Sequence, residues 1–287
     1  MKNLIILLLL GINTISYSQE LIIIEQDFEK ATKISKKENK LLFIDFYTTW
    51  CKPCKKMDLW IFQNDTLSHK LAKDYVLLKY NAEVDKKFNL SKKHHVNSYP
   101  TGIILNRNGY VLNRKYGFPG ENIEELSESV FEFSDKSIQL NKQNKTLKGY
   151  SNTININKYP DFYIDFVDRD DTKVTARHDF KNYWKNEKDR LSEEFFSTLV
   201  YFADKIPIST MDYFLENKEI YIEKYGEQDV DIALFHMIRG RFKNANNEKS
   251  QRKFKRATKF MKQIMTEDDF NQFLPIFKNN FEKSMKK

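Results

Sequence analysis

Apolar residues in the first half of the chain form runs that predict strands. Residues 41–47 (LLFIDFY) and 75–80 are continuous apolar runs, which are typical of strands covered on both faces of a sheet. Segments 101–106 and 110–116 flank Asn108-Gly109, a dipeptide that favours a tight turn between antiparallel strands. The pattern therefore predicts two central strands followed by a β-hairpin.

Apolar spacings of three and four predict helices before, between and after these strands. Phe28, Ala31 and Ile34, for example, share one face of the first helix. The predicted helices cover 27–37, 51–63, 66–74, 91–95 and 121–133. Helices that alternate with strands predict a small α/β sandwich, in which a central mixed sheet lies between helices.

The second half of the chain has a different pattern. Residues 134–157 are polar, rich in Lys, Asn, Ser and Gln, and predict a linker. Beyond it the periodicity is helical from Pro160 onward, without a repeat of fixed length. Further helices are predicted at 179–189, 192–204, 209–224, 227–243, 250–265 and 267–285. We therefore expect an α/β domain at 19–133 and an all-α domain at 158–287.

The N-terminus has the layout of a secretory signal peptide. A short basic start precedes an apolar run from Leu4 to Leu10, which is too short to span a bilayer. Ser16 and Ser18 place small residues at −3 and −1 of a cut before Gln19. We expect removal of residues 1–18 and a mature protein in the periplasm or outside the cell. A membrane anchor is the alternative interpretation.

Charge and histidine content exclude some classes of partner. The 287 residues carry a formal net charge of +8, which comes from scattered lysines and is typical of a solvated surface. We expect no nucleic-acid partner, which would also conflict with export. His178 and His236 have no partner at ligand spacing, so we expect packed or surface side chains there.

Both cysteines lie in one short segment, TTWCKPCKKMD at 48–58. A structural zinc site needs four ligands, and His94 and His95 are adjacent rather than three to five residues apart, so we expect no metal. A disulfide between residues three apart closes a very small loop and is a poor stabiliser. Redox exchange is the remaining chemistry.

The surroundings of Cys51 favour that chemistry. Cys51 would begin a helix directly after a buried strand, where free backbone N–H groups and the helix dipole favour the thiolate. Lys52 and Lys55 act in the same direction, and Pro53 fits the first helical turn because its missing N–H costs nothing there. Cys54, one turn into the helix on its apolar side, should be shielded and act second.

At these residues the chain resembles the thioredoxin superfamily. IDFYTTWCKPC carries the family's strand, an Asp six before the first Cys, a Trp immediately before it, and CxPC; YPTG at 99–102 resembles the family's cis-proline loop. Asn108-Gly109 and Gly117 also match, and the resemblance covers about 27–133. CKKMDLWIF further resembles a branch that includes secreted reductases and the terminal domain of the membrane electron-carrying disulfide reductase.

The resemblance implies a redox-active Cys51–Cys54 disulfide in place of a bound cofactor. Cys51 would form a mixed disulfide with a client protein, and Cys54 would resolve it. Asp45 would accept the proton of the resolving thiol, because burial raises the pKa of a carboxyl group and makes it a usable base. A purely structural role for Asp45 is the alternative.

Other residues would adjust the thiols or hold the client. The family often has a lysine near that Asp, so Lys79 on the neighbouring strand either takes this place or points to the surface. Asp58, four residues after Cys54, is either a second carboxylate near the thiols or a solvated helix position. Trp50 is expected to pack beside the disulfide.

The resemblance also implies a client-binding loop. A cis bond before Pro100 would expose the flanking backbone, so that Tyr99 pairs with an extended peptide, next to Thr101 and Trp50. Tyr99 is bulkier than its counterpart in many relatives. The Lys-Pro pair between the cysteines also departs from the Gly-Pro of the reducing cytosolic members.

We therefore expect an exported thiol–disulfide oxidoreductase that acts as a reductase on disulfide-containing client proteins, with a membrane electron donor as a further partner. The positive Lys52 beside Cys51 favours the reduced state and supports the alternative of an oxidase or isomerase. In a third interpretation, the helical half is a binding or scaffold module on an α/β carrier. The oligomeric state is left open.

Overall fold

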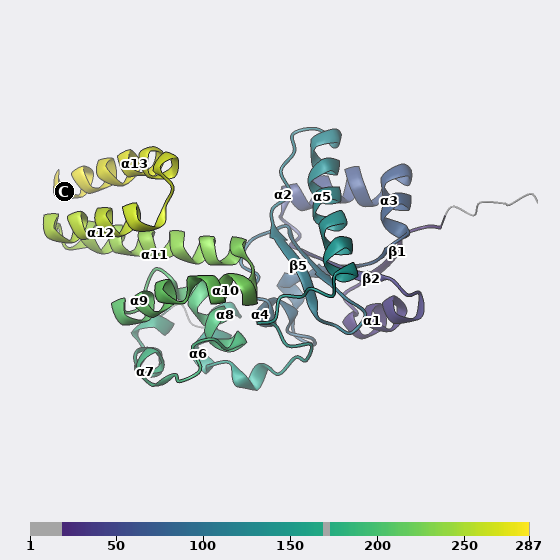
Figure 1. The fold of residues 1–287 in the computed structure, drawn as a ribbon, viewed down its shortest axis with the longest axis horizontal. Helices are drawn as coiled ribbons and strands as arrows, with labels where there is room; N and C mark the ends of the chain where they lie inside the picture. The colour runs from purple at the N-terminus through teal and green to yellow at the C-terminus, as the bar shows by residue number, and fades with distance from the viewer. Residues whose placement is uncertain (1–18, 169–172, 287) are drawn as a thin grey trace, which may run out of the picture.

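The computed structural model describes residues 19–168 and 173–286 (Figure 1). Within these residues, five strands form one sheet in the order β1-β3-β2-β4-β5. β1, β3 and β2 are parallel, and β4 and β5 run antiparallel at the other edge. The strands are β1 Ile22–Glu25, β2 Leu41–Tyr47, β3 Tyr75–Asn81, β4 Thr101–Leu105 and β5 Val111–Tyr116. The signal peptide predicted at 1–18 lies outside the described residues.

Helices account for most of the remaining described chain. They are α1 Phe28–Lys37, α2 Lys52–Met57, α3 Asp65–Ala72, α4 Leu90–Lys93, α5 Ile123–Lys142, α6 Asp161–Val167, α7 His178–Asn186, α8 Glu193–Phe202, α9 Ile208–Glu216, α10 Lys218–Tyr225, α11 Glu227–Asn247, α12 Gln251–Ile264 and α13 Glu267–Lys286. A π-helical turn, Asp58–Phe62, continues α2 directly. The predicted fold class, an α/β sandwich followed by a helix-rich region, is confirmed.

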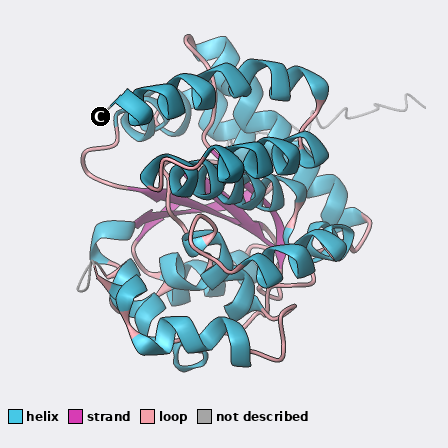
Figure 2. Cartoon of the chain, turned by 90° about the vertical axis from the view of Figure 1, so that its left-hand side faces the viewer, coloured by secondary structure: helices cyan, strands magenta, loops and turns pink. Residues whose placement is uncertain are grey.

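The two faces of the sheet belong to two separate apolar clusters. On β2, Leu42, Ile44 and Phe46 face the side of α1, α4 and the helical region, which is the part of the chain formed by α6–α13. Leu41 and Phe43 face α2, α3 and α5 on the other side. Figure 2 shows the strands enclosed between these layers of helices. By the alternation of a strand, Asp45 lies on the same face as Phe43, under α2.

Some predicted elements differ from the structure. β1 was not among the predicted elements, although its sequence IIIE suits a strand. The helix predicted to end at residue 133 continues to Lys142, because Ile138 and Leu140 extend its apolar face through a polar sequence. The helix predicted at 209–224 is two helices, because the backbone of Asn217 leaves the helical conformation and its side chain bonds to the carbonyl of Tyr213.

The segment between α5 and α6 is tied to both halves of the chain. The N–H of Leu147 donates to the carbonyl of Val111 at 2.8 Å, and the N–H of Gly149 donates to the carbonyl of Lys224 at 2.8 Å. Tyr150, which follows, is buried. These contacts fix the second part of the segment predicted as a linker, while the predicted division into domains at 133 and 158 stays a prediction.

The helical region packs against α4, on the first face of the sheet. The hydroxyls of Tyr159 and Tyr163 donate to the carbonyls of Lys93 and Lys92 at 3.2 and 2.6 Å. The Lys93 ammonium forms a buried ion pair with Glu193 on α8, at 2.6 Å. Buried apolar side chains of the sheet and of α8 belong to one continuous cluster, so the helical region closes this face of the sheet.

A cluster of buried polar side chains also joins the two halves. Arg114 on β5 forms an ion pair with Asp229 on α11, with 2.9 Å between Nε and Oδ2. Arg114 also donates to the hydroxyl of Tyr150 at 2.8 Å, and Tyr116 donates to Oδ1 of Asp229 at 2.6 Å. Nε2 of His95 lies 3.2 Å from the same carboxylate oxygen. The cluster places one ion pair in the interior, with hydrogen bonds to both charges.

The charges in this cluster follow from their surroundings. Burial disfavours ionisation of Asp229, but the charge of Arg114 and the hydrogen bonds to its oxygens outweigh burial and hold its pKa below the ordinary value. Burial and the charge of Arg114 lower the pKa of His95 to about 4. At neutral pH the cluster therefore contains a carboxylate, a guanidinium and a neutral imidazole.

We predict that Asp229→Ala destabilises the protein by about 3–5 kcal/mol at pH 7, because it leaves the buried Arg114 without its counter-charge. The measurement is urea denaturation of the whole chain, with Asp231→Ala as the control, an exposed carboxylate on the same helix. Since the pKa of Asp229 is lowered, its stabilisation is present above about pH 4 and is lost as the pH falls through that lowered pKa. Equal, small effects of the two substitutions would contradict the buried ion pair.

Candidate active site

The two cysteines lie where β2 ends and α2 begins. Cys51 is the N-cap of α2, and its N–H donates to the carbonyl of Thr48 at 3.2 Å. Cys51 and Cys54 form a disulfide. Their side chains are almost covered, because the residues are 3% and 1% exposed. Contact with a client therefore has to be made at the rim of the site.

The start of α2 is arranged to stabilise negative charge on sulfur. The backbone N–H of Cys54 donates to Sγ of Cys51 at 3.1 Å, as an N-cap interaction. After reduction, the same N–H and the helix dipole would favour a thiolate on Cys51. Lys52, Pro53 and Lys55 are exposed on the outer side of the helix, so the two lysines add positive charge near the thiols from the solvent side.

A buried acid–base group lies under α2. Asp45 on β2 is fully buried, and the Lys79 ammonium on β3 contacts its Oδ2 at 2.6 Å. The parallel register places Asp45 and Lys79 directly opposite each other. Lys79 also donates to the carboxylate of Asp58, one helical turn after Cys54. The second oxygen of Asp45, Oδ1, is buried and has no hydrogen-bond partner among the described residues.

These contacts set the protonation of the pair. Burial raises the pKa of Asp45, and the nearby charge of Lys79 only partly opposes it. Burial alone would lower the pKa of Lys79, but Asp45 and Asp58 outweigh it and raise that pKa. Lys79 is therefore a permanent cation at neutral pH. The raised pKa gives Asp45 a stronger affinity for protons than an ordinary carboxyl group has, and no hydrogen bond among the described residues occupies its Oδ1.

The predicted cis-proline loop lies beside the cysteines. The Tyr99–Pro100 peptide bond is cis, and Thr101 pairs with Phe46 near the end of β2 that leads to Cys51. The ring of Trp50 is 60% exposed and meets the ring of Tyr99 edge-on, with 6.0 Å between ring centres. Trp50 and Tyr99 therefore form an aromatic rim on the site.

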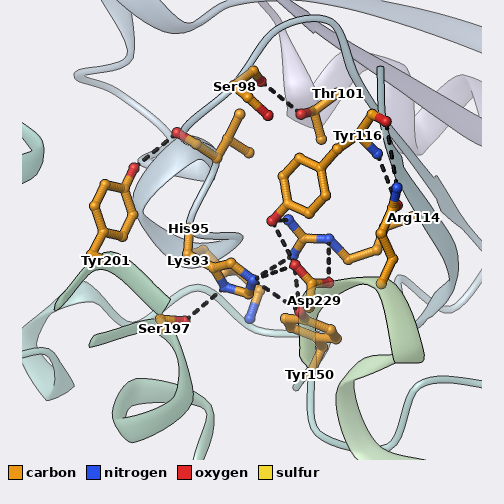
Figure 3. Close-up of polar contacts among 12 residues, drawn as sticks. Lys93, His95, Ser98, Thr101, Arg114, Tyr116, Tyr150, Ser197, Tyr201 and Asp229 are labelled. Atoms are coloured by element: carbon orange, nitrogen blue, oxygen red, sulfur yellow. Dashed lines mark hydrogen bonds and ion pairs between the residues drawn. The ribbon is translucent and has the colours of Figure 1, made fainter. Parts of the chain in front are cut away.

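Thr101 has a different position from these two aromatic residues. Its side chain is buried, and its hydroxyl donates to the carbonyl of Ser98 at 2.7 Å (Figure 3). The contact closes the loop on itself. The hydroxyl of Thr101 therefore holds the shape of the loop, and the residue itself is covered between β2 and β5.

The loop is also supported from the helical region, which the sequence analysis did not foresee. Tyr201 on α8 donates to the carbonyl of Val96 at 2.8 Å, just before the loop. Tyr116 on β5, which pairs with Thr101 of the loop, lies in the cluster with Asp229 (Figure 3). The sequence carries little signal for either contact, because the partners are 105 and 113 positions apart.

The described residues were also predicted to lack a metal site, and the following observations bear on that prediction and on membrane-spanning helices. Among the described residues, no three side chains of His, Cys, Asp or Glu are grouped so that they could share a metal ion. His178 is exposed and His236 is half-buried. No helix within the described ranges is long and apolar enough to cross a bilayer.

Comparison with known proteins shows which proteins the region around this site is similar to. A family model described as a thioredoxin-like domain matches residues 28–131, so α6–α13 lie outside it. Thioredoxin-1 of Drosophila melanogaster is 37% identical over 82 residues, which are 29% of this chain and 70% of that protein. Thioredoxin of Staphylococcus aureus is 33% identical over 97 residues, which are 32% of this chain and 84% of that protein.

Among solved structures, a putative disulphide-isomerase from Bacteroides thetaiotaomicron is 32% identical, and the match covers 41% of this chain and 95% of that one, with a TM-score of 0.35. The matched region contains both cysteines, Asp45 and the cis-proline loop. The identity to the two thioredoxins, and the share of their length that is matched, lead to one conclusion: the chain belongs to the thioredoxin-like family of disulfide oxidoreductases.

Proposed function

We propose that this chain is an exported thiol–disulfide oxidoreductase that reduces disulfide bonds in client proteins. The observation that carries the proposal is the Cys51–Cys54 disulfide at the N-terminus of α2, with a buried carboxylate below it and a cis-proline loop beside it. A passive scaffold has no physical need for all three. The reducing direction rests on the resemblance of CKPCKKMD to the reductase branch, and export rests on the sequence of residues 1–18.

The first step forms a mixed disulfide. The Cys51 thiolate attacks one sulfur of the client disulfide, and the other client sulfur leaves as a thiolate and takes a proton from water. The N–H of Cys54 and the start of α2 stabilise the Cys51 thiolate before the attack. Because both cysteines are almost covered, the client disulfide approaches along the rim formed by Trp50 and Tyr99.

The second step releases the client. The Cys54 thiol gives its proton to Asp45 and attacks Sγ of Cys51, and the second client sulfur leaves and takes a proton. The client gains two electrons and two protons, and the chain is left with the Cys51–Cys54 disulfide. Two electrons from a donor dithiol, for which we propose a membrane protein, return the chain to its reduced form.

The client is held by its main chain. The backbone of Tyr99 lies directly before β4, which begins at Thr101, and the bond that joins Tyr99 to Pro100 is cis. An extended client peptide can pair with this backbone, in the manner of strand addition. Recognition of backbone atoms gives breadth across client sequences, while the aromatic rim adds apolar contact area.

We predict different outcomes for the two cysteine substitutions. Cys54→Ser should accumulate a mixed disulfide with a client such as insulin, because Cys51 still attacks but nothing resolves the bond. Cys51→Ser should form no such adduct, and turnover should fall to the uncatalysed rate. Non-reducing electrophoresis and mass spectrometry measure the adduct. Equal trapping by both variants would contradict the assigned order of attack.

We predict that Asp45→Asn slows the second step by about tenfold or more at pH 7, because the proton acceptor of Cys54 is lost. The wild-type rate should rise with pH through the raised pKa of Asp45, and the variant should lose that rise. Stopped-flow measurement of mixed-disulfide decay across pH tests both points. Asp74→Asn, at an exposed carboxylate, is the matched control.

The same substitution should raise stability. The pKa of Asp45 is higher in the folded state than in the unfolded state. The free energy of unfolding of the wild type therefore falls as the pH rises from the unfolded-state pKa to the folded-state pKa, and it stays lower at higher pH. Asp45→Asn should therefore be more stable than the wild type at pH 7. A variant that is less stable and equally fast would show that Asp45 is a structural residue.

A further inference from the structure

A groove of about 930 Å³ adjoins the active site, between the thioredoxin-like unit and the helical region. Its lining includes Thr48, three residues before Cys51, and Tyr99 of the cis-proline loop. On the other side the lining comes from the helical region, with Phe166 and Val167 of α6 and Tyr201 of α8. The thioredoxin-like unit alone therefore forms only one wall.

The chemistry of the lining suits a polypeptide. Val96, Tyr99, Phe166, Val167 and Tyr201 contribute apolar and aromatic surface from both walls. The exposed charges at its edge are of both signs, as at Glu83 and Lys86, so no strongly charged ligand is selected. The volume lies at the upper end of the range for small-molecule sites and exceeds the need of a small disulfide.

The two walls are held in a fixed relation. The hydroxyl of Tyr201 on one wall donates to the carbonyl of Val96 on the other at 2.8 Å. The buried Lys92 ammonium of α4 pairs with Asp168 at the end of α6, at 2.6 Å. Direct contacts therefore link α6 and α8 to the segment that carries the cis-proline loop. Because the walls are already fixed, little conformational entropy of the groove is lost when a ligand binds.

The position of the groove identifies its occupant. A client disulfide at Cys51 brings with it the polypeptide on either side, and the backbone of that polypeptide meets the chain at Tyr99. A client segment that continues past Tyr99 enters the groove, because Tyr99 belongs both to the cis-proline loop and to the lining of the groove. The walls combine apolar side chains with polar and charged ones, so they can contact both the side chains and the polar backbone of an extended polypeptide segment.

We propose that the helical region supplies the second wall of a client-binding groove, in which an extended segment of a client polypeptide lies beside the disulfide being reduced. This proposal rests on the proposed reductase function and adds to it a binding surface, on α6 and α8, that lies outside the thioredoxin-like family model. It also gives the helical region a direct part in recognition.

The test compares one polypeptide disulfide with one small disulfide. Val167→Arg and Asn97→Arg place a large charged side chain in the groove from opposite walls, and Asn97 is exposed, so its substitution does not disturb packing. The control is Ile208→Arg, at a residue of α9 that is 63% exposed and outside the groove lining. For each, kcat/KM is measured with insulin and with glutathione disulfide, using dithiothreitol as donor, and folding is checked by thermal unfolding.

The expected result is a fall of at least about fivefold in the ratio of insulin to glutathione-disulfide activity in both groove variants, mainly through KM, and the wild-type ratio in Ile208→Arg. An unchanged ratio in either folded groove variant would overturn the groove. A wild-type protein that reduces neither disulfide would overturn the reductase function and the groove with it. If only the groove proposal is wrong, both disulfides are still reduced by all folded variants, so this outcome can be told apart from failure of the reductase function.

Discussion

The ion pair between Arg114 and Asp229 is the constraint on which the arrangement of the two halves depends. Removing either charge would leave the other buried without its counter-charge, so the pair ties β5 to α11. Asp229 of this pair also contacts His95, which precedes the cis-proline loop, and Tyr116, which pairs with Thr101 of the loop. The helical region is therefore part of the structure that shapes the active site, although it lies outside the thioredoxin-like family model.

Two buried carboxylates show how burial and partners assign different tasks to one residue type. Asp229 has a guanidinium and several hydrogen bonds, which outweigh burial, and its pKa is lowered. Asp45 has one ammonium, shared with Asp58, so burial prevails and its pKa is raised. The first carboxylate serves structure, whereas the second has the properties of a proton acceptor beside a resolving thiol.

The sequence predicted those features that depend on local pattern. The apolar runs at 41–47 and 75–80 are buried strands, and a cis bond lies within YPTG, as the resemblance implied. Features that depend on contacts between distant segments were not predictable. The register that pairs Asp45 with Lys79 is one example, and the contact of Tyr116 with Asp229 across 113 positions is another. The extension of α5 was missed because Ile138 and Leu140 pack on the sheet within a sequence of linker-like composition.

The reduction potential of the Cys51–Cys54 pair in the whole mature chain tests the central claim most directly. The protein is equilibrated with glutathione buffers of graded ratio, and the mass added by alkylation of free thiols gives the reduced fraction. A reductase should titrate near about −270 mV, the value of thioredoxin. A value near about −120 mV would contradict the reducing direction and would favour an oxidase or isomerase, because such a site donates its disulfide to clients.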